Sequence, residues 1–247
     1  MKTIMITGCS SGYGLETAHL FHAQGWHVVA TMRTPDSDVL APAERLRIVP
    51  LDVTRSDSIG QALALAGPID VLVNNAGIGL FGAFEATSMA TVRDVFETNT
   101  FGTMALTQAV LPQFRARRSG CVINVTSSAT LAPFPLVAAY TASKTAIEGF
   151  TESLALELAQ FDVRVKLVQP GYGPTTRFAA NGAQRMQGLL PDAYMPLAQS
   201  IFATLGQSAA VTTEAAVAEA VWTAANDSSE TLRYPAGEDA VELARRG

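Results

Sequence analysis

The sequence predicts an α/β protein with a doubly wound parallel sheet and helices on both faces. Short continuous apolar runs rich in β-branched residues alternate with longer segments whose apolar residues recur at helical spacing. Continuous runs suit strands that are buried on both faces of a parallel sheet. A glycine-rich stretch follows the first run at residues 7–14. Repeated alternation of this kind implies right-handed crossovers, and 247 residues suit a single domain.

The elements follow in order along the chain. Strands are expected at residues 3–7, 27–31, 47–51, 70–73, 121–125 and 163–168. Helices are expected at residues 15–24, 57–66, 89–115 and 142–160. Gly25 is expected to stop the first helix, and Ser56 to serve as the N-cap of the second.

Residues 172 to about 207 interrupt this alternation. The stretch holds Pro174, Pro191 and Pro196 among several large apolar side chains, and it is too long and apolar for a solvated connection. One interpretation is a lid that closes over an apolar substrate. The other is an extra helix pair packed on the core or on another subunit.

Composition narrows the class of partner. The net charge of −5 gives no general basic field for nucleic acid or anionic membranes, so a small-molecule ligand is favoured. No stretch reaches the roughly 20 apolar residues of a membrane span, and the N-terminus lacks the pattern of a signal peptide. We therefore expect a cytoplasmic protein without nucleic-acid or membrane partners.

Cysteine and histidine usage argues against a metal site or a disulfide framework. Cys9 and Cys121 are far apart in sequence and form no CxxC motif. His19, His22 and His27 lack a third cluster of ligands and are interpreted as surface or packing residues. No metal is expected.

The stretch T-G-C-S-S-G-Y-G at residues 7–14 stands at the first strand-to-helix turn. Gly8 permits the sharp turn, Gly12 lets the backbone approach a pyrophosphate, and Gly14 allows close helix packing. The helix N-terminus adds amides and a favourable dipole. The spacing is G-x-x-x-G-x-G, and its place in the fold predicts a dinucleotide site. The predicted cofactor contacts in this loop are Gly8, Ser10, Ser11, Gly12, Tyr13 and Gly14.

The end of the second strand bears on the choice of cofactor. An acidic residue there would bind the 2′-hydroxyl of the adenine ribose, but the sequence reads A-T-M-R and ends in Arg33. A guanidinium can pair with a 2′-phosphate, so NADP(H) is favoured over NAD(H). The alternatives are that Arg33 is a solvated loop residue, or that Asp36 or Asp38 folds back onto the ribose.

Tyr140 and Lys144 stand four residues apart at the start of the expected helix at residues 142–160, with Tyr140 just before it. Positions four apart share a helical face, so the phenol and the ammonium could reach one reacting group. The spacing alone also fits a core tyrosine beside a solvated lysine.

Several motifs in one order carry a resemblance to a known family. They are T-G-x-x-x-G-x-G at residues 7–14, Asp52-Val53, Asn74-Asn75-Ala76-Gly77, Asn99, Ser127, Y-x-x-x-K at residues 140–144 and Pro170-Gly171. Together they resemble the short-chain dehydrogenase/reductase family over about residues 2–176, with a family-like R-Y-P-A-G-E-D-A at residues 233–240.

The resemblance implies four catalytic residues. Tyr140 would transfer the proton, and Lys144 would favour the phenolate and bond the nicotinamide ribose. Ser127 would bond the substrate carbonyl, with Ser128 as the alternative. Asn99 would hold a helix distortion and a water that connects to the lysine.

The resemblance also implies further cofactor contacts. The pair Asp52-Val53 would lie against the adenine. Thr175, after the last expected strand, would contact the carboxamide of the nicotinamide. Gly173 departs from the family, where Val or Ile is common, and this puts the carboxamide contact in doubt. With Tyr140 and Lys144, the remaining predicted contacts are Arg33, Asp52, Val53, Asn75, Ala76, Gly77, Pro170, Gly171, Gly173 and Thr175.

The activity implied is hydride transfer between NADP(H) and a carbonyl or alcohol. The branch with 17β-hydroxysteroid dehydrogenases and retinol-type reductases looks most similar, which together with the apolar segment suggests a lipophilic substrate. A homodimer or homotetramer built on the helices at residues 89–115 and 142–160 is implied as well. Alternatives are a catalytically silent dinucleotide sensor and a redox-neutral epimerase or dehydratase on the same fold.

Overall fold

One parallel sheet organises the molecule. The computed structural model describes residues 1–176, 182–207 and 210–246. The strand order is β3-β2-β1-β4-β5-β6-β7, so the chain starts in the middle of the sheet, runs to one edge and then returns to build the other. The strands are β1 Thr3–Thr7, β2 His27–Met32, β3 Leu46–Pro50, β4 Val71–Asn74, β5 Gly120–Val125, β6 Val163–Pro170 and β7 Arg233–Ala236. This order confirms the predicted doubly wound fold.

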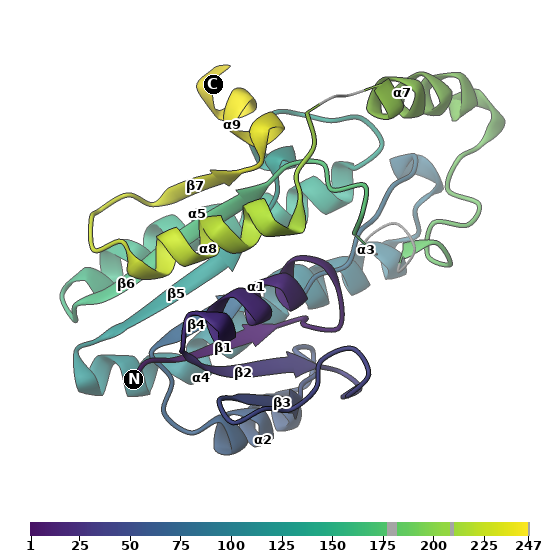
Figure 1. Ribbon diagram of the computed structural model, residues 1–247. Helices are drawn as coiled ribbons and strands as arrows, with labels where there is room; N and C mark the ends of the chain where they lie inside the picture. The colour runs from purple at the N-terminus through teal and green to yellow at the C-terminus, as the bar shows by residue number, and fades with distance from the viewer. Residues whose placement is uncertain (177–181, 208–209, 247) are drawn as a thin grey trace.

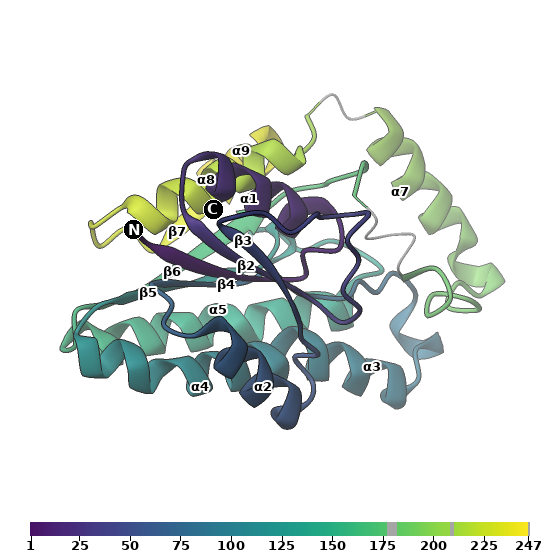
Figure 2. The same cartoon turned by 60° about the horizontal axis from the view of Figure 1, so that its bottom comes forward.

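Helices cover both faces of the sheet, as Figures 1 and 2 show. On one face α1 (Gly12–Ala23) and α8 (Glu214–Asn226) pack side by side. On the other face lie α2 (Ser56–Ala66), α4 (Gly102–Arg117) and α5 (Ala138–Ala159). The strands between them are buried on both sides, which explains their continuous apolar sequences. A short α9, Glu238–Arg246, follows β7.

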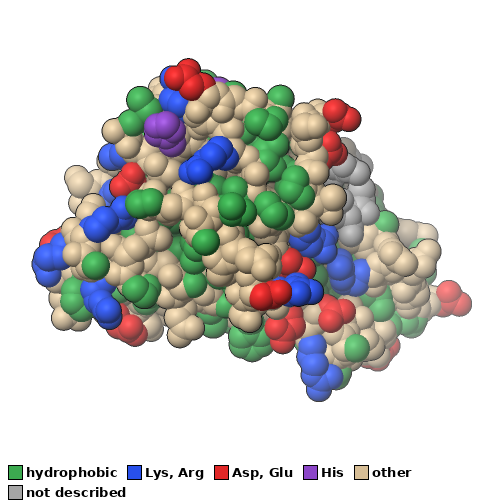
Figure 3. All heavy atoms as spheres, turned by 90° about the horizontal axis from the view of Figure 1, so that it is seen from below, with side chains coloured by type: hydrophobic (Ala, Val, Ile, Leu, Met, Phe, Trp, Pro, Cys, Tyr) green, Lys and Arg blue, Asp and Glu red, His purple; other side chains and the backbone are tan. Residues whose placement is uncertain are grey.

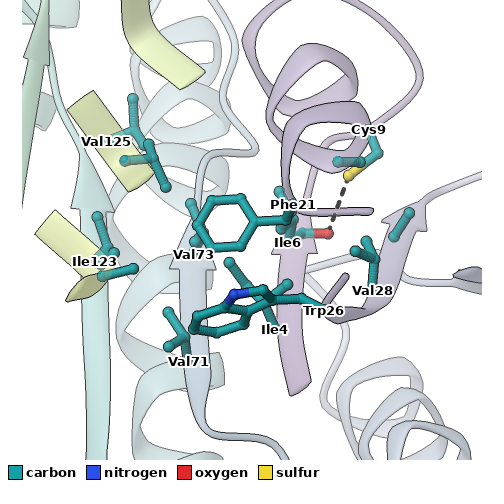
Figure 4. Close-up of a cluster of buried hydrophobic side chains, with 14 of the residues drawn as sticks. Ile4, Ile6, Cys9, Phe21, Trp26, Val28, Val71, Val73, Ile123 and Val125 are labelled. Carbon is teal, nitrogen blue, oxygen red and sulfur yellow. Dashed lines mark hydrogen bonds between the residues drawn. The ribbon is translucent and has the colours of Figure 1, made fainter. Parts of the chain in front are cut away.

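An aromatic cluster holds the last turn of α1, the helix that follows the glycine loop. Phe21 is fully buried, and its ring meets Trp26 and Trp222 edge-on at centroid distances of 5.0 Å each. Figure 4 shows Phe21 and Trp26 over the side chains of β1, β4 and β5. Burying one such side chain contributes about 1.5–3 kcal/mol. The cluster therefore holds α1 against α8 and against the sheet.

The expected elements are confirmed, with boundaries that differ by a few residues. Gly25 has φ of +83°, as a glycine stop after α1 requires. The prediction that Ser56 is the N-cap of α2 is wrong, because Arg55 has the extended cap conformation and Ser56 is the first helical residue. The sequence runs did not reveal β7, since it is short and contains Pro235. An edge strand tolerates proline because one row of its amides needs no partner.

The long helix expected at residues 89–115 is divided. It consists of α3 (Met89–Phe96), a π-helical turn η2 (Glu97–Phe101) and α4. A π turn inside a helix often marks a functional position. Here it contains Asn99.

The segment expected to be a lid or an interface element lies beyond the ends of the strands to which the arrows point (Figures 1 and 2). It includes a 3-10 turn at Asp192–Tyr194 and α7 at Met195–Gln207, while its residues 177–181 lie outside the described part of the chain. Ile201 of α7 packs with Ala83 and Leu136. Both interpretations of this segment stay predictions.

The surface carries charges of both signs. On the face in Figure 3, Lys and Arg side chains stand at separate places, several of them beside Asp or Glu. Among the described helices, none is long and apolar enough to cross a membrane. Within residues 1–176, 182–207 and 210–246 there is also no group of three or more His, Cys, Asp or Glu that could hold a metal ion.

Candidate active site

The carboxyl ends of the central strands bring the predicted site residues together. The glycine loop follows β1, Asn75 follows β4, and Ser127 stands just beyond β5. Tyr140 and Lys144 come from the first turns of α5. In open α/β sheets, ligands bind at this edge, where the strand order reverses between β1 and β4.

The glycine loop is shaped so closely that side chains would not fit. A Cβ atom on Gly8 would lie 2.9 Å from Ala76 Cα, and one on Gly14 would lie 2.5 Å from the Gly8 carbonyl oxygen. Gly8 and Gly12 have φ of +76° and +56°, which glycine adopts without strain. The N-cap residue Ser11 makes no side-chain cap bond, which leaves the first amides of α1 for another acceptor. These features fit a pyrophosphate at the start of α1.

Asn75 is hydrogen-bonded to Thr7, where the glycine loop begins. Its side-chain amide donates to the Thr7 carbonyl oxygen at 2.8 Å, and its backbone N–H donates to Thr7 Oγ1 at 2.9 Å. The Ala76 N–H donates to the same hydroxyl at 2.9 Å. The predicted cofactor residues Asn75 and Ala76 therefore tie the end of β4 to the end of β1. Gly77 follows them and is exposed.

Asn99 lies in the π turn η2 and bonds both the loop after β4 and α5. Its Oδ1 accepts the Ile78 N–H at 2.8 Å, and its Nδ2 donates to the Ile78 carbonyl at 3.0 Å and to Ser143 Oγ at 3.1 Å. Ser143 Oγ in turn donates to the Tyr140 carbonyl oxygen at 2.7 Å. Asn99 thus links the loop after β4 to the helix turn that carries Tyr140.

Tyr140 and Lys144 are both buried, with 9% and 6% of their surface exposed. Burial raises the pKa of Tyr140 to about 12, although a hydrogen bond with the Ser127 side chain acts in the opposite direction. Burial lowers the pKa of Lys144 to about 8, and Glu148 opposes this shift. Lys144 Nζ donates to the Val125 carbonyl at 2.9 Å.

The expected lowering of the pKa of Tyr140 by Lys144 stays a prediction, because burial is the largest influence on this phenol in the structure. Desolvation of the phenol outweighs other influences, so Tyr140 carries its proton at neutral pH. A protonated phenol can donate to an oxygen that gains negative charge. A Cβ on Gly77 would lie 3.2 Å from Asn99 Oδ1 and 3.4 Å from Lys144 Nζ, so these two polar groups approach one point.

The hydroxyl that meets Tyr140 is that of Ser127. Ser127 is the N-cap of a 3-10 turn at Ser128–Thr130, where its Oγ accepts the Ala129 N–H at 3.2 Å. This cap sets the direction of its side chain. The Ser128 carbonyl accepts bonds from the two residues that follow the turn.

The residues predicted for the adenine end lie after β2 and β3. Arg33 is exposed directly after β2. Asp52 Oδ1 accepts from the Thr54 N–H at 3.0 Å and from Thr54 Oγ1 at 2.7 Å. Partial burial works to raise the pKa of Asp52, but these bonds and the nearby Arg33 give a net lowering. Asp36 bonds the Asp38 N–H within its own loop at 2.9 Å.

Val53 is buried, so that a Cβ on Gly102 of α4 would lie only 2.7 Å from its Cγ2. The structure thus places Val53 as a packing contact at the end of the Asp52-Val53 motif. Its side chain supports the loop from inside.

The loop after β6 is tied to the C-terminal region. The Gly171 N–H donates to Thr212 Oγ1 at 3.0 Å, and the Tyr172 N–H donates to Asp239 Oδ2 at 2.6 Å. Asp239 Oδ1 also accepts from Thr212 Oγ1 at 2.7 Å. The tail motif at residues 233–240 therefore positions Pro170-Gly171, a role that its place in the sequence does not reveal.

The structure does not bring Thr175 to the glycine loop. Thr175 is exposed, and its Oγ1 bonds both Glu214 oxygens at 3.0 and 2.9 Å. The neighbouring Thr176 faces Gly12, where a Cβ would lie 3.6 Å from Thr176 Cβ. A Cβ on Gly173 would lie 2.1 Å from Tyr13 Oη, so Tyr13 occupies the space of the side chain that Gly173 lacks.

Sequence reasoning also missed a buried acid, Glu148, one helical turn beyond Lys144. The signal was present, because an acid four residues after Lys144 shares its helical face.

Fold and site together define a class. A doubly wound sheet with a glycine loop that fits a dinucleotide, and with Tyr, Lys and Ser side chains gathered beside it, is the arrangement of a nicotinamide-dependent oxidoreductase.

Comparison with known proteins gives the family. A family model for short chain dehydrogenases matches residues 2–186, and the chain belongs to the short-chain dehydrogenase/reductase family. It is therefore an NAD(P)-dependent dehydrogenase or reductase. Retinol dehydrogenase 8 of Bos taurus is 39% identical over 233 residues, which cover 84% of this chain and 74% of the relative. This similarity agrees with the predicted retinol and steroid branch.

Solved structures agree on the fold. A short-chain dehydrogenase from Streptomyces avermitilis has a TM-score of 0.83 and 35% identity, covering 99% of this chain and 91% of the other. A short chain dehydrogenase from Burkholderia cenocepacia, solved in complex with NADP, has a TM-score of 0.79 and 25% identity over 99% of this chain and 93% of the other.

Proposed function

We propose that the protein is an NADP(H)-dependent carbonyl reductase or alcohol dehydrogenase for lipophilic substrates, with Tyr140 as the general acid and base. The observation that carries the proposal is the buried phenol of Tyr140, hydrogen-bonded to Ser127, with Lys144 one helical turn away on the same face. All three groups lie at the dinucleotide-binding edge of the sheet.

The proton chemistry follows from this arrangement. When bound, the nicotinamide supplies a hydride for reduction and accepts one in oxidation. Tyr140 gives its proton to the carbonyl oxygen as that oxygen becomes an alkoxide, and Ser127 donates a hydrogen bond to the same oxygen. The ammonium of Lys144 stabilises the phenolate that remains. A proton from solvent, passed by way of Lys144 and the Asn99 region, restores Tyr140, and alcohol oxidation runs in reverse.

The preference for NADP(H) rests on Arg33. Its guanidinium stands free of the core directly after β2, where an acid would instead disfavour a 2′-phosphate. Asp36, the alternative partner of the ribose, accepts a bond within its own loop. NADP in the Burkholderia cenocepacia relative agrees with this choice.

A lipophilic substrate is supported by the segment beyond the strand ends. Its described part presents Met195, Leu197 and Phe202 with 38%, 43% and 53% of their surface exposed. The Phe202 ring lies 5.2 Å from that of Phe81, which comes from the loop after β4. A closing lid of this kind would exclude water from the reacting groups. The name of the retinol dehydrogenase relative points to the same class of substrate.

Tyr140→Phe tests the proposal. A panel of steroid, retinoid, aliphatic and sugar carbonyls is followed by consumption of NADPH and of NADH. The variant is expected to lose roughly 10²- to 10⁴-fold in kcat, since it lacks the proton donor, while NADPH affinity is retained. Tyr234→Phe is the matched control, because it removes a hydroxyl that bonds Asp227. Near-normal turnover by Tyr140→Phe would refute the mechanism, and a product formed without net cofactor change would favour an epimerase or dehydratase.

A further inference from the structure

Glu148 is a buried carboxylate beside the catalytic lysine, with 8% of its surface exposed. Its Oε1 accepts from Thr126 Oγ1 and from Thr130 Oγ1, each at 2.8 Å. The Gln169 side-chain amide donates to its two oxygens at 2.9 and 3.2 Å. Arg233 Nε of β7 lies 3.7 Å from Oε2. Donors from β5, β6 and β7 and their adjoining turns therefore surround the ionised form and stabilise it.

Glu148 lies close enough along α5 for its negative charge to act on Lys144. Tyr140, Lys144 and Glu148 occupy successive turns on one face of α5. Lys144 bonds the neutral Val125 carbonyl of β5, and the neutral Asn99 amide of η2 lies with Lys144 Nζ near Gly77. Glu148 is the charged group that favours the ammonium form of Lys144 against the effect of burial.

Several charged or titratable groups of the described residues lie near Lys144 and Glu148. Tyr140 lies one helical turn before Lys144 on the same helix, and Tyr140 in turn helps to raise the pKa of Tyr13 of α1, after burial of that phenol. Arg233 faces Glu148 from β7 and also pairs with the exposed Glu152, one turn further along α5. The cation of Arg233 therefore weakens the field of Glu148 at Lys144.

A second contact joins Glu148 to the serine. Thr130 Oγ1 lies 2.8 Å from Glu148 Oε1 and 2.6 Å from the Ser127 carbonyl oxygen, so it bridges the two. Thr126, just before Ser127, bonds the same carboxylate oxygen. Glu148 thus anchors the turn that aims Ser127 at Tyr140.

We infer that Glu148 is a positioning residue that keeps Lys144 charged and holds the Ser127 turn, so that carbonyl reduction continues to higher pH. This inference rests on the proposed function. Glu148 acts through Lys144 and Ser127 and has no role in contact with the substrate.

Glu148→Gln is the first test, because it keeps the shape and an acceptor for the two threonines but removes the charge. The form active in reduction has Tyr140 protonated and Lys144 charged, and it disappears at the first proton loss of the coupled pair. Removing an anion makes that loss easier whichever group gives up the proton. The alkaline limb of kcat/KM for reduction is therefore expected at lower pH, with about a tenfold loss on the limb for each pH unit of displacement.

Glu152→Gln is the matched control. Glu152 is on the same helix, pairs with the same Arg233 and is 47% exposed at its side chain, so its removal should leave the alkaline limb in place. A role for Glu148 in structure alone predicts a different result, namely one uniform factor of loss at every pH.

Lysine NMR gives a readout that needs no substrate. The chain contains three lysines, Lys2, Lys144 and Lys166, so a ¹³C-lysine titration has few signals, and Lys144→Arg assigns one of them. The midpoint of Lys144 is expected to fall in Glu148→Gln and to stay unchanged in Glu152→Gln. If no carbonyl is reduced, the proposed function fails while this titration still decides the charge effect.

Arg233→Met tests the same electrostatic effect of Glu148 on Lys144, with the shift expected in the opposite direction. It is the test to use if Glu148→Gln does not fold. Without the guanidinium, Glu148 acts more strongly on Lys144, so the Lys144 midpoint and the alkaline limb should move to higher pH. Folded variants in which neither the limb nor the Lys144 midpoint moves would overturn the inference.

Discussion

Replacing Lys144 by methionine should stabilise the protein at neutral pH while it removes turnover. The site keeps an ammonium in a place where only 6% of the side chain is exposed. Burial lowers its pKa from 10.5 to about 8, and since each pH unit corresponds to about 1.4 kcal/mol, the buried charge costs about 3 kcal/mol at neutral pH. The methionine side chain is also flexible enough to fill the space that the Lys144 side chain occupies.

The dependence on pH isolates this cost. Below about pH 8 both folded and unfolded Lys144 are protonated and the cost is complete. Above that pH the unfolded chain binds more protons than the folded one, so the free energy of unfolding rises with pH. Relative to Lys144→Met, the wild type should therefore gain about 2–3 kcal/mol between about pH 7 and pH 10. The variant also leaves the Val125 carbonyl without its lysine partner, a loss of about 1 kcal/mol that does not depend on pH.

Urea denaturation of both proteins at several pH values measures the difference. Lys2→Met is the control, since Lys2 is exposed and its replacement removes a lysine charge from the surface. A difference for Lys144→Met that is flat with pH would show that the lysine is not held as a buried charge, and the electrostatic part of the mechanism would fail with it.

Three further substitutions test separate parts of the site. Arg33→Asp should raise KM for NADPH at least about tenfold relative to KM for NADH, because it replaces the phosphate partner by a like charge; an unchanged ratio would remove Arg33 from cofactor selection. Gly173→Val should lower stability by about 1–3 kcal/mol through its clash with Tyr13, and Tyr13→Ile in the same chain should restore most of that loss in a thermal denaturation cycle. Asn99→Leu should cost about 2–4 kcal/mol in urea denaturation, since the Ile78 N–H and carbonyl lose their partner, and a smaller effect would mean that solvent replaces it.

The sheet could be predicted because its strands are buried on both faces. Burial on both sides requires continuous apolar runs such as Val71–Asn74 and Gly120–Val125, and these stand out in sequence. Arg233–Ala236 did not stand out, since an edge strand has weaker requirements and tolerates Pro235. The π turn was also invisible to periodicity, because it depends on a bond between Asn99 and Ile78 from a distant loop.

Contacts between distant residues explain what the motifs could not show. Gly173 departs from the family pattern, and the sequence alone gives no reason for this departure. In the structure Tyr13, 160 positions earlier, fills the space that a larger residue at 173 would occupy. The departure therefore preserves a filled wall beside the glycine loop. Nearby, Thr175 bonds Glu214, while Thr176 is the threonine that lies beside Gly12 of the loop.

Tyr140, Lys144 and Glu148 on α5 are linked electrostatically, because the charge of each group is stabilised by the next one along the helix. Tyr140 is buried deeply enough to keep its proton, so the phenolate left after proton donation needs a cation nearby. Lys144 supplies that cation but is itself destabilised by the same burial. Glu148 offsets the cost, and its own charge is stabilised by Thr126 after β5, Gln169 of β6 and Arg233 of β7. In this protein the Y-x-x-x-K motif is thus followed by an anchored acid one helical turn further on.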